Sequence, residues 1–160
     1  MQTFETRHRV AHGADDMYAL VANVEDYPNF LPLCEALRIV RREAVGDREV
    51  LTADMEVGYR MIRERFTSRV TLDPSYRMIL VEYVDGPFEH LENRWTFEPH
   101  GTDSSEIDFY IAYKFRSRLF VRLVGSLFDK AVRKFTNAFE VRADEVYGVQ
   151  NTAHARSSSR

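Results

Sequence analysis

The sequence predicts an α+β fold in which a curved antiparallel sheet of about seven strands wraps around one long C-terminal helix. Between about residues 36 and 115, apolar residues alternate with polar ones at a period of two, which is typical of half-buried strands. From about residue 117 the spacing changes to that of a helix. Because a sheet with one apolar face must bury that face against another element, we expect the helix to cover it.

Two shorter elements precede the main sheet region. Residues 3–10 alternate between apolar and polar side chains and are predicted to form the first strand. Gly13 ends this strand, and Asp15 and Asp16 suit the N-terminus of a short helix. The apolar stripe of that helix consists of Met17, Leu20, Val21 and Val24.

The main region divides into six further strands. They are predicted at residues 38–44, 49–59, 61–72, 78–84, 90–98 and 106–115. Short turns such as Gly46-Asp47 and Asp85-Gly86-Pro87 separate them, so neighbouring strands should be antiparallel. The final helix, at residues 117–146, would be roughly 45 Å long at ~1.5 Å per residue. This is the helix-grip arrangement, in which the gap between sheet and helix is a natural apolar pocket.

Length and composition predict a single domain at residues 1–147, followed by a disordered tail at residues 148–160. A chain of 160 residues can bury enough surface to fold without a disulfide or a metal. The single cysteine, the absence of a signal peptide and the absence of an apolar run of spanning length predict a cytoplasmic protein. Any contact with the inner membrane would then be peripheral.

Charge is distributed unevenly along the chain. The 22 basic and 25 acidic residues give a net charge of −3, which argues against a general nucleic-acid binder and against DNA as a partner. Between Lys114 and Arg142, however, eight basic residues face two acidic ones, so this segment carries +6 and the remainder −9. Two interpretations stay open: a solvated helix face, or a contact with anionic lipid headgroups or ribosomal RNA.

Residues 27–34, with the sequence YPNFLPLC, form an unusual apolar segment. Pro28 and Pro32 each remove a backbone donor and restrict the residue before them, so neither an ordinary helix nor a central strand is predicted. Loops are usually polar, and this one must therefore pack against the core or against a cavity. We expect Phe30, Leu31 and Pro32 to form a semi-rigid rim beside the mouth of the pocket.

Three segments carry a resemblance to a known family. They are YPNFLPLC at 27–34, DGPF at 85–88 running into LENRWTF at 91–97, and AFEVRA at 138–143. In this order they resemble the coenzyme Q-binding START-domain family, the polyketide cyclase/dehydrase-like branch of the helix-grip (START/Bet v 1-like) superfamily. The bacterial ribosome-association toxin is grouped with it. The resemblance extends over about residues 2–146.

The resemblance implies a function in lipid binding. It implies that a polyprenyl quinone such as ubiquinone, or a similar hydrophobic lipid, occupies the internal cavity of a carrier or chaperone that supports respiratory electron transport. It implies no known reaction, so we expect a non-enzymatic protein without a resident cofactor. Eukaryotic members are mitochondrial, whereas this chain lacks a transit peptide, as a bacterial member would. Two alternatives remain: a toxin-like regulator that blocks ribosomal subunit joining, and a polyketide aromatase/cyclase-like enzyme.

The predicted ligand-binding residues face the gap between sheet and helix. They are Phe30, Leu31, Pro32, Val57, Phe66, Asn93, Trp95, Phe109, Leu123, Leu127, Ala131 and Phe135. The last four recur at four-residue spacing and are predicted to form the inner stripe of the helix. Phe120, Phe128 and Phe139 lie to one side of this stripe, where they either close the cavity or contact a membrane.

The sequence predicts neither a catalytic set nor a metal site. None of the five histidines has a partner at metal-ligand spacing, and Cys34 is expected to be a small buried hydrophobe. Asn93 lies on an inward face, where its amide either bonds to neighbouring backbone or donates to the head of a ligand. Glu64 shares a face with Ile62 and Phe66. Because an unpaired buried carboxylate is costly, we expect either an arginine partner or a shift of register there.

Overall fold

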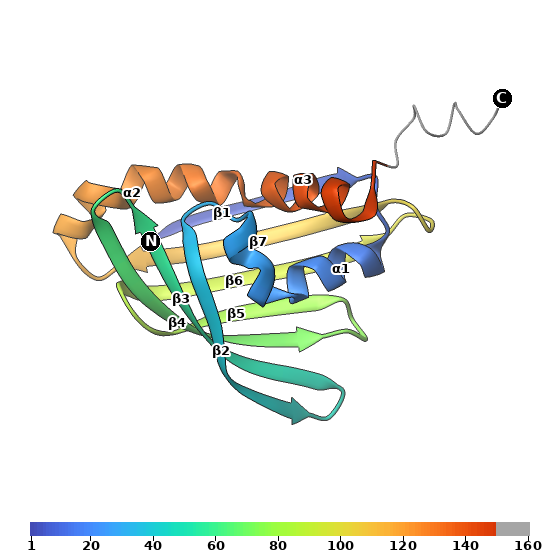
Figure 1. Ribbon diagram of the computed structural model, residues 1–160, viewed down its shortest axis with the longest axis horizontal. Helices are drawn as coiled ribbons and strands as arrows, with labels where there is room; N and C mark the ends of the chain where they lie inside the picture. The colour runs from blue at the N-terminus through green and yellow to red at the C-terminus, as the bar shows by residue number, and fades with distance from the viewer. Residues whose placement is uncertain (150–160) are drawn as a thin grey trace.

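The predicted sheet is present in the computed structural model, which describes residues 1–149 (Figure 1). Of the predicted tail, only Gly148 and Val149 fall within these residues, and 150–160 lie outside them. The strands are β1 (Gln2–Val10), β2 (Cys34–Val45), β3 (Arg48–Tyr59), β4 (Ile62–Asp73), β5 (Met78–Asp85), β6 (Phe88–Pro99) and β7 (Ser105–Phe115). The helices are α1 (Ala14–Ala22), the 3₁₀ helix η1 (Val24–Asn29), α2 (Arg118–Arg133) and α3 (Phe135–Tyr147).

The strands form one antiparallel sheet in the order β1-β7-β6-β5-β4-β3-β2. Strands β2 to β7 follow one another as a meander, as their short turns require. Strand β1 instead pairs with β7, from Gln2 opposite Tyr113 to Val10 opposite Ser105. The predicted α+β fold with an antiparallel sheet is thereby confirmed.

Helices cover one face of this curved sheet. Figure 1 shows α2 and α3 running lengthwise beside β1 and β7, while α1 and η1 lie toward the end where α3 is found. The strands β2, β3 and β4 curl away from the rest of the sheet. Contacts of α1 with β6 and α3, and of η1 with β2, close that end of the fold.

Strand β7 shows how the sequence pattern builds the core. Ile107, Phe109 and Ile111 alternate with polar residues and are buried beneath the helices, whereas Glu106 and Asp108 are less buried on the opposite face. Tyr113 and Phe115 continue the buried row. Burying an aliphatic or aromatic side chain of this size contributes about 1.5–3 kcal/mol relative to leaving it exposed. The period-two pattern therefore determines which face of the sheet receives the helices.

The C-terminal helix is interrupted, in contrast to the single helix predicted for residues 117–146. α2 ends at Arg133 and α3 begins at Phe135. The N–H of Lys134 bonds to the carbonyl groups of Ala131 and Val132, which closes the last turn of α2. Neither proline nor glycine marks this position, and the apolar spacing continues through it. The interruption lets α2 follow β7 while α3 packs on α1.

The proline-containing segment is partly helical rather than a loop throughout. Its first residues belong to η1, which includes Pro28, and turns at 30–33 lead into β2. Leu33 has a φ of 70°, in the left-handed region that non-glycine residues seldom occupy. Its carbonyl accepts a hydrogen bond of 3.0 Å from the N–H of Gly58. The segment is thus attached to β3, at one side of the space between sheet and helices.

Candidate functional site

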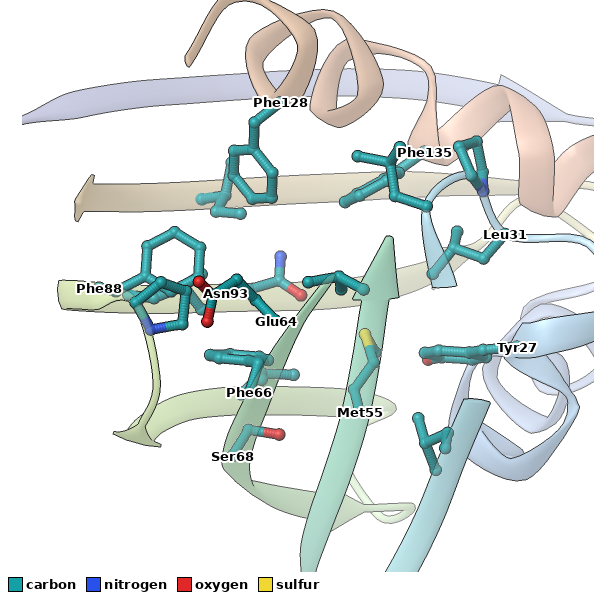
Figure 2. Close-up of a pocket in the computed structure, with 18 of the residues that line it drawn as sticks. Tyr27, Leu31, Met55, Glu64, Phe66, Ser68, Phe88, Asn93, Phe128 and Phe135 are labelled. Atoms are coloured by element: carbon teal, nitrogen blue, oxygen red, sulfur yellow. The ribbon is translucent and has the colours of Figure 1, made fainter. Parts of the chain in front are cut away.

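An apolar cavity lies between the helices and the concave face of the sheet (Figure 2). Its wall is formed by strands β2 to β7, by η1 and the turns after it, and by the inward sides of α2 and α3. The space between the helices and the sheet is about 1250 Å³ when the part open to solvent is counted. A concave, mostly apolar site is typical of a pocket for a small hydrophobic molecule.

Aromatic rings hold the two helices against the sheet around this cavity. On α2, Phe128 packs edge to face against Tyr113 with ring centroids 4.8 Å apart, and it lies 5.5 Å from Phe88. On α3, Phe139 packs edge to face against Trp95 at 5.1 Å. Each such pair adds about 0.5–1.5 kcal/mol beyond the burial of its area. These contacts keep the helices at a defined distance from the strands.

Eight of the twelve predicted ligand-binding residues line the cavity. They are Leu31, Pro32, Val57, Phe66, Asn93, Trp95, Leu127 and Phe135. Six separate parts of the chain supply them, and the fold brings them together: the turn after η1, strands β3, β4 and β6, and the two C-terminal helices. Their contact with a ligand stays a prediction.

Two of the remaining four residues lie on α2, and the predicted inner stripe is wrong at both. Leu123 is 61% exposed, and Ala131 is buried without lining the cavity. The lining residues of α2 are Phe120, Val124, Leu127 and Phe128. Apolar residues surround most of the first half of this helix, so their spacing alone does not reveal which side faces inward.

The other two residues pack elsewhere in the core. Phe109 is fully buried behind Trp95, with ring centroids 4.6 Å apart. Phe30 packs edge to face against Phe139 at 5.0 Å and against Tyr27 at 6.1 Å. Phe30 is therefore part of the packing between η1 and α3, whereas its neighbour Leu31 points toward the cavity. The predicted rim is reduced to Leu31 and Pro32, together with Leu33.

Several lining residues were not among the predicted ligand-binding residues. They include Tyr27, Met55, Ser68 and Phe88 (Figure 2). Phe120, Phe128 and Phe139, for which the sequence left open closing the cavity or contacting a membrane, line the cavity. Alternation along β3 and β4 does contain a usable signal, because Met55 follows Ala53 on the inward face and Ser68 follows Phe66. Phe88 and Phe139 belong to conspicuous motifs, yet only the folded arrangement shows that they border the same space.

The amide of Asn93 is fully oriented by the protein. Its Nδ2 donates to the carbonyl of Tyr110 at 2.9 Å, and its Oδ1 accepts from Trp95 Nε1 at 2.8 Å. Of the two interpretations left open by the sequence, bonding to neighbouring backbone is the one present in the structure. Asn93 also lines the cavity, so it supports the indole ring there.

Glu64 matches neither outcome expected from the sequence. Strand β4 pairs with β3 without a register shift, with Val57 opposite Glu64, so the side chain stays on the inward face. Of the two arginines adjacent in sequence, Arg63 pairs with Glu35 at 3.1 Å and Arg65 is exposed opposite Glu56. Glu64 lines the cavity, and within residues 1–149 it forms no ion pair. A carboxylate is therefore placed among apolar side chains (Figure 2).

Burial suppresses the reactivity of two groups near the cavity. It raises the pKa of the Cys34 thiol to about 12, so the thiolate that a nucleophile requires is not formed at neutral pH. Burial likewise raises the pKa of the Tyr27 hydroxyl far above its ordinary value, and that hydroxyl donates to the carbonyl of Val21. Both groups behave as parts of the packing, as expected for Cys34.

Exposed apolar side chains border one side of the cavity. Met61, in the β3–β4 turn, is 95% exposed, and Leu119 and Leu123 in the first half of α2 are 64% and 61% exposed. Their neighbours Tyr59 and Phe120 line the cavity. Because α2 packs chiefly on β7 and α3, its other flank lies toward the β3–β4 turn (Figure 1).

The basic residues of the C-terminal segment fall into two groups. Lys114, Arg133 and Arg142 form ion pairs with acidic residues at N–O distances of 2.8 to 3.3 Å. Five others are exposed and form no ion pair within the described chain. They are Arg116, Arg118, Arg122, Lys130 and Lys134. The charge available to a partner is thus concentrated on α2, beside the exposed leucines.

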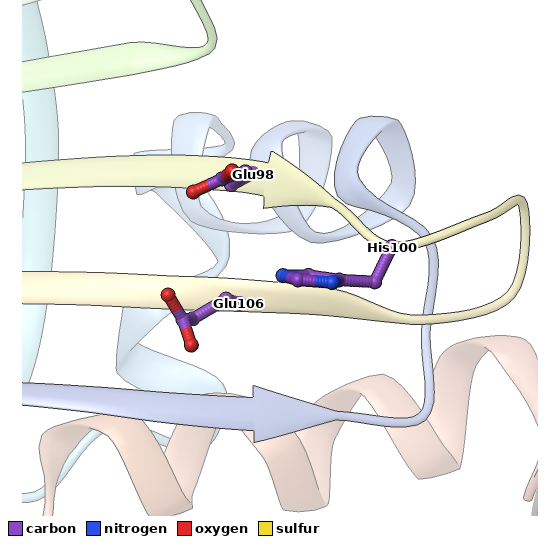
Figure 3. A group of neighbouring side chains, drawn as sticks. All are labelled: Glu98, His100 and Glu106. Atoms are coloured by element: carbon purple, nitrogen blue, oxygen red, sulfur yellow. The ribbon is translucent and has the colours of Figure 1, made fainter.

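Three possible metal ligands meet at the end of the β6–β7 hairpin, outside the cavity lining. Ligand atoms of Glu98, His100 and Glu106 lie within 4.8 Å of one another (Figure 3). Glu98 and Glu106 are opposite each other on adjacent strands, a relationship that spacing along one strand does not reveal. Both Glu98 and His100 are exposed, and such groups commonly gather without an ion, so we assign no metal here.

Among the described residues, no helix combines the length and the apolar character that crossing a bilayer requires.

A family model described as polyketide cyclase / dehydrase and lipid transport matches residues 10–140. The chain belongs to this family. In this member of the polyketide cyclase family, the matched region runs from the end of β1 into α3 and so includes every residue that lines the cavity.

Two groups of curated relatives resemble this polyketide cyclase family member over most of its length. The ribosome association toxin RatA of Escherichia coli K12 is 36% identical over 141 residues, covering 88% of this chain and 86% of the toxin. The mitochondrial coenzyme Q-binding protein COQ10 homolog B of Xenopus laevis is 30% identical over 147 residues, covering 90% of this chain and 59% of that protein. The predicted resemblance to both groups is thereby confirmed.

Solved structures confirm the helix-grip fold of this family member. An 18 kDa protein of Caulobacter crescentus has a TM-score of 0.75 and 31% identity, covering 93% of this chain and 100% of that one. A START superfamily protein of Mycobacterium smegmatis has a TM-score of 0.74 at 20% identity, covering 90% of this chain and 98% of that one. The Zhui aromatase/cyclase of Streptomyces has a TM-score of 0.73 at 18% identity, covering 89% of this chain and 93% of that one. The last two likenesses show the fold alone.

Proposed function

We propose that the protein binds a polyprenyl quinone such as ubiquinone, or a similar hydrophobic lipid, and acts as a carrier or chaperone without chemistry of its own. The observation that carries this proposal is the apolar cavity between the sheet and the C-terminal helices. Apolar area removed from water contributes about 25 cal/mol per Å², so an enclosed isoprenoid tail would be held by burial alone. The coenzyme Q-binding relatives support the class of ligand.

A carrier of such a lipid must reach the membrane in which the lipid resides. Met61, Leu119 and Leu123 are exposed beside the cavity, and Arg118 and Arg122 lie next to the leucines on α2. Apolar side chains flanked by arginines suit a shallow contact with an anionic leaflet. We therefore propose a cytoplasmic protein that touches the inner membrane transiently, with the cavity opening toward the lipid.

Identification of the bound lipid tests the proposal directly. The protein is purified, its lipids are extracted and identified by mass spectrometry, and the same is done for Leu127→Trp. The larger ring should occupy part of the cavity that Leu127 lines and should reduce the bound quinone at least severalfold. Val141→Trp, at an exposed position of α3 outside the proposed membrane surface, is the matched control and should retain the wild-type amount.

Two negative results together would contradict the proposal that the protein carries a lipid. If no quinone or related lipid is recovered from wild-type protein, and added short-chain ubiquinone does not raise its melting temperature, the cavity does not serve this purpose. Ligand that binds the native state must raise the melting temperature, because binding shifts the folding equilibrium by mass action.

A second candidate function is regulation of the ribosome. It is favoured by the 36% identity to the RatA toxins and by the exposed basic residues of α2, which could meet ribosomal RNA. Overexpression followed by sucrose-gradient analysis distinguishes the two: a ribosome-directed protein should reduce the 70S fraction, and the joint Arg118→Ala and Arg122→Ala substitution should restore it. An unchanged 70S fraction counts against this candidate. The aromatase/cyclase alternative has support from the fold alone.

A further inference from the structure

Glu64 is a charged group in a wall that is otherwise almost entirely apolar. It projects from β4 between the lining residues Ile62 and Phe66, and regular pairing with β3 holds it on the inward face. Ser68 follows on the same face and also lines the cavity. A carboxylate gains nothing from contact with an isoprenoid tail, because removing it from water without a partner is costly.

The surrounding residues do not supply that partner within the described chain. Arg63 pairs with Glu35, and the exposed Arg65 lies opposite Glu56 on the outer face. The amide of Asn93, which also lines the cavity, already bonds to Tyr110 and Trp95. Ser68 lies four residues farther along β4, roughly 13 Å away at ~3.3 Å per residue. Glu64 is half-buried, so its carboxylate reaches water. A molecule that fills the cavity displaces this water, and its own polar head must then supply the donor.

We propose that Glu64 accepts a hydrogen bond from a hydroxyl group on the ligand's head, so that the cavity selects lipids whose heads donate hydrogen bonds. This inference rests on the proposed function. An ionised carboxylate offers acceptor oxygens only. The carbonyl oxygens of an oxidised quinone are also acceptors only, whereas the hydroquinone carries two O–H donors. For a quinone-type lipid, the protein should therefore prefer the reduced form.

Ser68 completes the polar part of the wall without changing this preference. Its hydroxyl can donate or accept and can serve an oxygen of either oxidation state. An anionic head, such as that of a fatty acid or a phospholipid, would instead meet the carboxylate of Glu64 with like charge. The selected class is thus a neutral lipid with a hydroxylated head.

The test compares two oxidation states of one short-chain ligand. The full chain is titrated with ubiquinone-2 and, under anaerobic conditions, with ubiquinol-2, and the fluorescence of Trp95 is followed. Trp95 is the single tryptophan of the chain and lines the cavity. Ubiquinol-2 should bind about tenfold more tightly or better, as expected for a hydrogen bond to a charged acceptor.

Two variants test whether Glu64 causes the preference for ubiquinol-2 over ubiquinone-2. Glu64→Gln keeps the shape of the side chain but adds a donor, so the preference should fall below about threefold. Glu56→Gln removes a carboxylate from the outward face of the neighbouring strand and should keep the wild-type preference. Thermal unfolding verifies that both variants are folded.

Each outcome separates this inference from the proposed function. Equal affinity of wild-type protein for both oxidation states overturns the role of Glu64 and leaves lipid carriage intact. A preference that persists unchanged in Glu64→Gln also overturns it. If neither form binds, the proposed function itself fails and the inference with it. The wild-type comparison needs no substitution, so it decides the question even if Glu64→Gln does not fold.

Discussion

Trp95 Nε1 donates a hydrogen bond of 2.8 Å to Oδ1 of Asn93, two residues earlier on the same strand. Both side chains point into the cavity, and Asn93 Nδ2 is in turn held by the carbonyl of Tyr110 on β7. The amide thereby satisfies the polar edge of the indole ring, so that the wall can present the apolar face of Trp95. This small network joins two strands at the middle of the candidate site.

Substitution of Asn93 by leucine should destabilise the protein. It leaves the carbonyl of Tyr110 and the indole N–H of Trp95 without these partners, and an unsatisfied buried group costs about 1–3 kcal/mol. Urea unfolding should show the free energy of unfolding reduced by an amount in this range. Asn137→Leu, at an exposed position of α3, should change it by less than about 0.5 kcal/mol. Equal effects of the two substitutions would contradict the role given to Asn93.

Phe30 and Leu31 should differ in what they support, although they are adjacent in the chain. Phe30→Ala removes ring contacts with Phe139 and Tyr27 and should lower the free energy of unfolding by about 2 kcal/mol, less than for a fully buried ring. The lipid bound per folded molecule should stay the same. Leu31→Ala should reduce that amount, because Leu31 lines the cavity. Unfolding curves and lipid extraction on both variants measure the two quantities. Loss of lipid in Phe30→Ala alone would place the rim at Phe30 after all.

The contact between Asp26 and Arg142 should make stability depend on pH at the acid end. Burial raises the pKa of the Asp26 carboxyl, but hydrogen bonds from Asn29 and Arg142 outweigh it and bring the pKa below the ordinary 3.8. A group with a lowered native pKa stabilises the fold fully above its unfolded pKa. That contribution is lost as the pH falls through the native pKa. Asp26→Asn should therefore reduce stability at pH 7 by about 1–2 kcal/mol.

The difference between wild-type protein and Asp26→Asn should shrink as the pH is lowered from about 4 toward 2. Below the native pKa, the wild-type carboxyl is protonated and resembles the amide. Chemical unfolding at pH 7, 4 and 2.5 measures this difference. Asp47→Asn, in the exposed β2–β3 turn, is the control and should match wild type throughout. A difference that stays constant with pH would show that the charge of Asp26 is not responsible.

Introduction of a charge at Leu123 should weaken membrane contact without affecting the fold. Leu123→Glu places an anion on the exposed flank of α2, where the proposed membrane surface lies. Flotation with vesicles containing anionic lipids should show binding reduced severalfold, and raised salt should weaken the wild-type interaction. Val141→Glu, at an exposed position on α3, should bind vesicles as wild type does. Equal loss in both variants would point to net charge rather than to a defined surface.

Much of the candidate site could be predicted because strands expose alternate residues. Val57, Phe66, Asn93 and Trp95 were placed on inward faces by alternation, and all of them line the cavity. The same reasoning was less successful on α2, where Leu123 turned out to be exposed. The first half of α2 is apolar over most of its circumference, so spacing there does not set the exact rotation of the helix about its own axis. That rotation depends on rings such as Phe128, which pack on β6 and β7.

The sequence by itself determined the kinds of elements, their order and the apolar face of each strand, because alternation, helical spacing and turn residues are properties of neighbouring positions. Only the tertiary structure decided that the last helix is interrupted at Lys134, that Phe30 packs on α3, and that Glu64 remains in the cavity without an arginine partner. Each of these depends on the curvature of the sheet and on contacts between residues far apart in the chain. Local patterns therefore do not contain them.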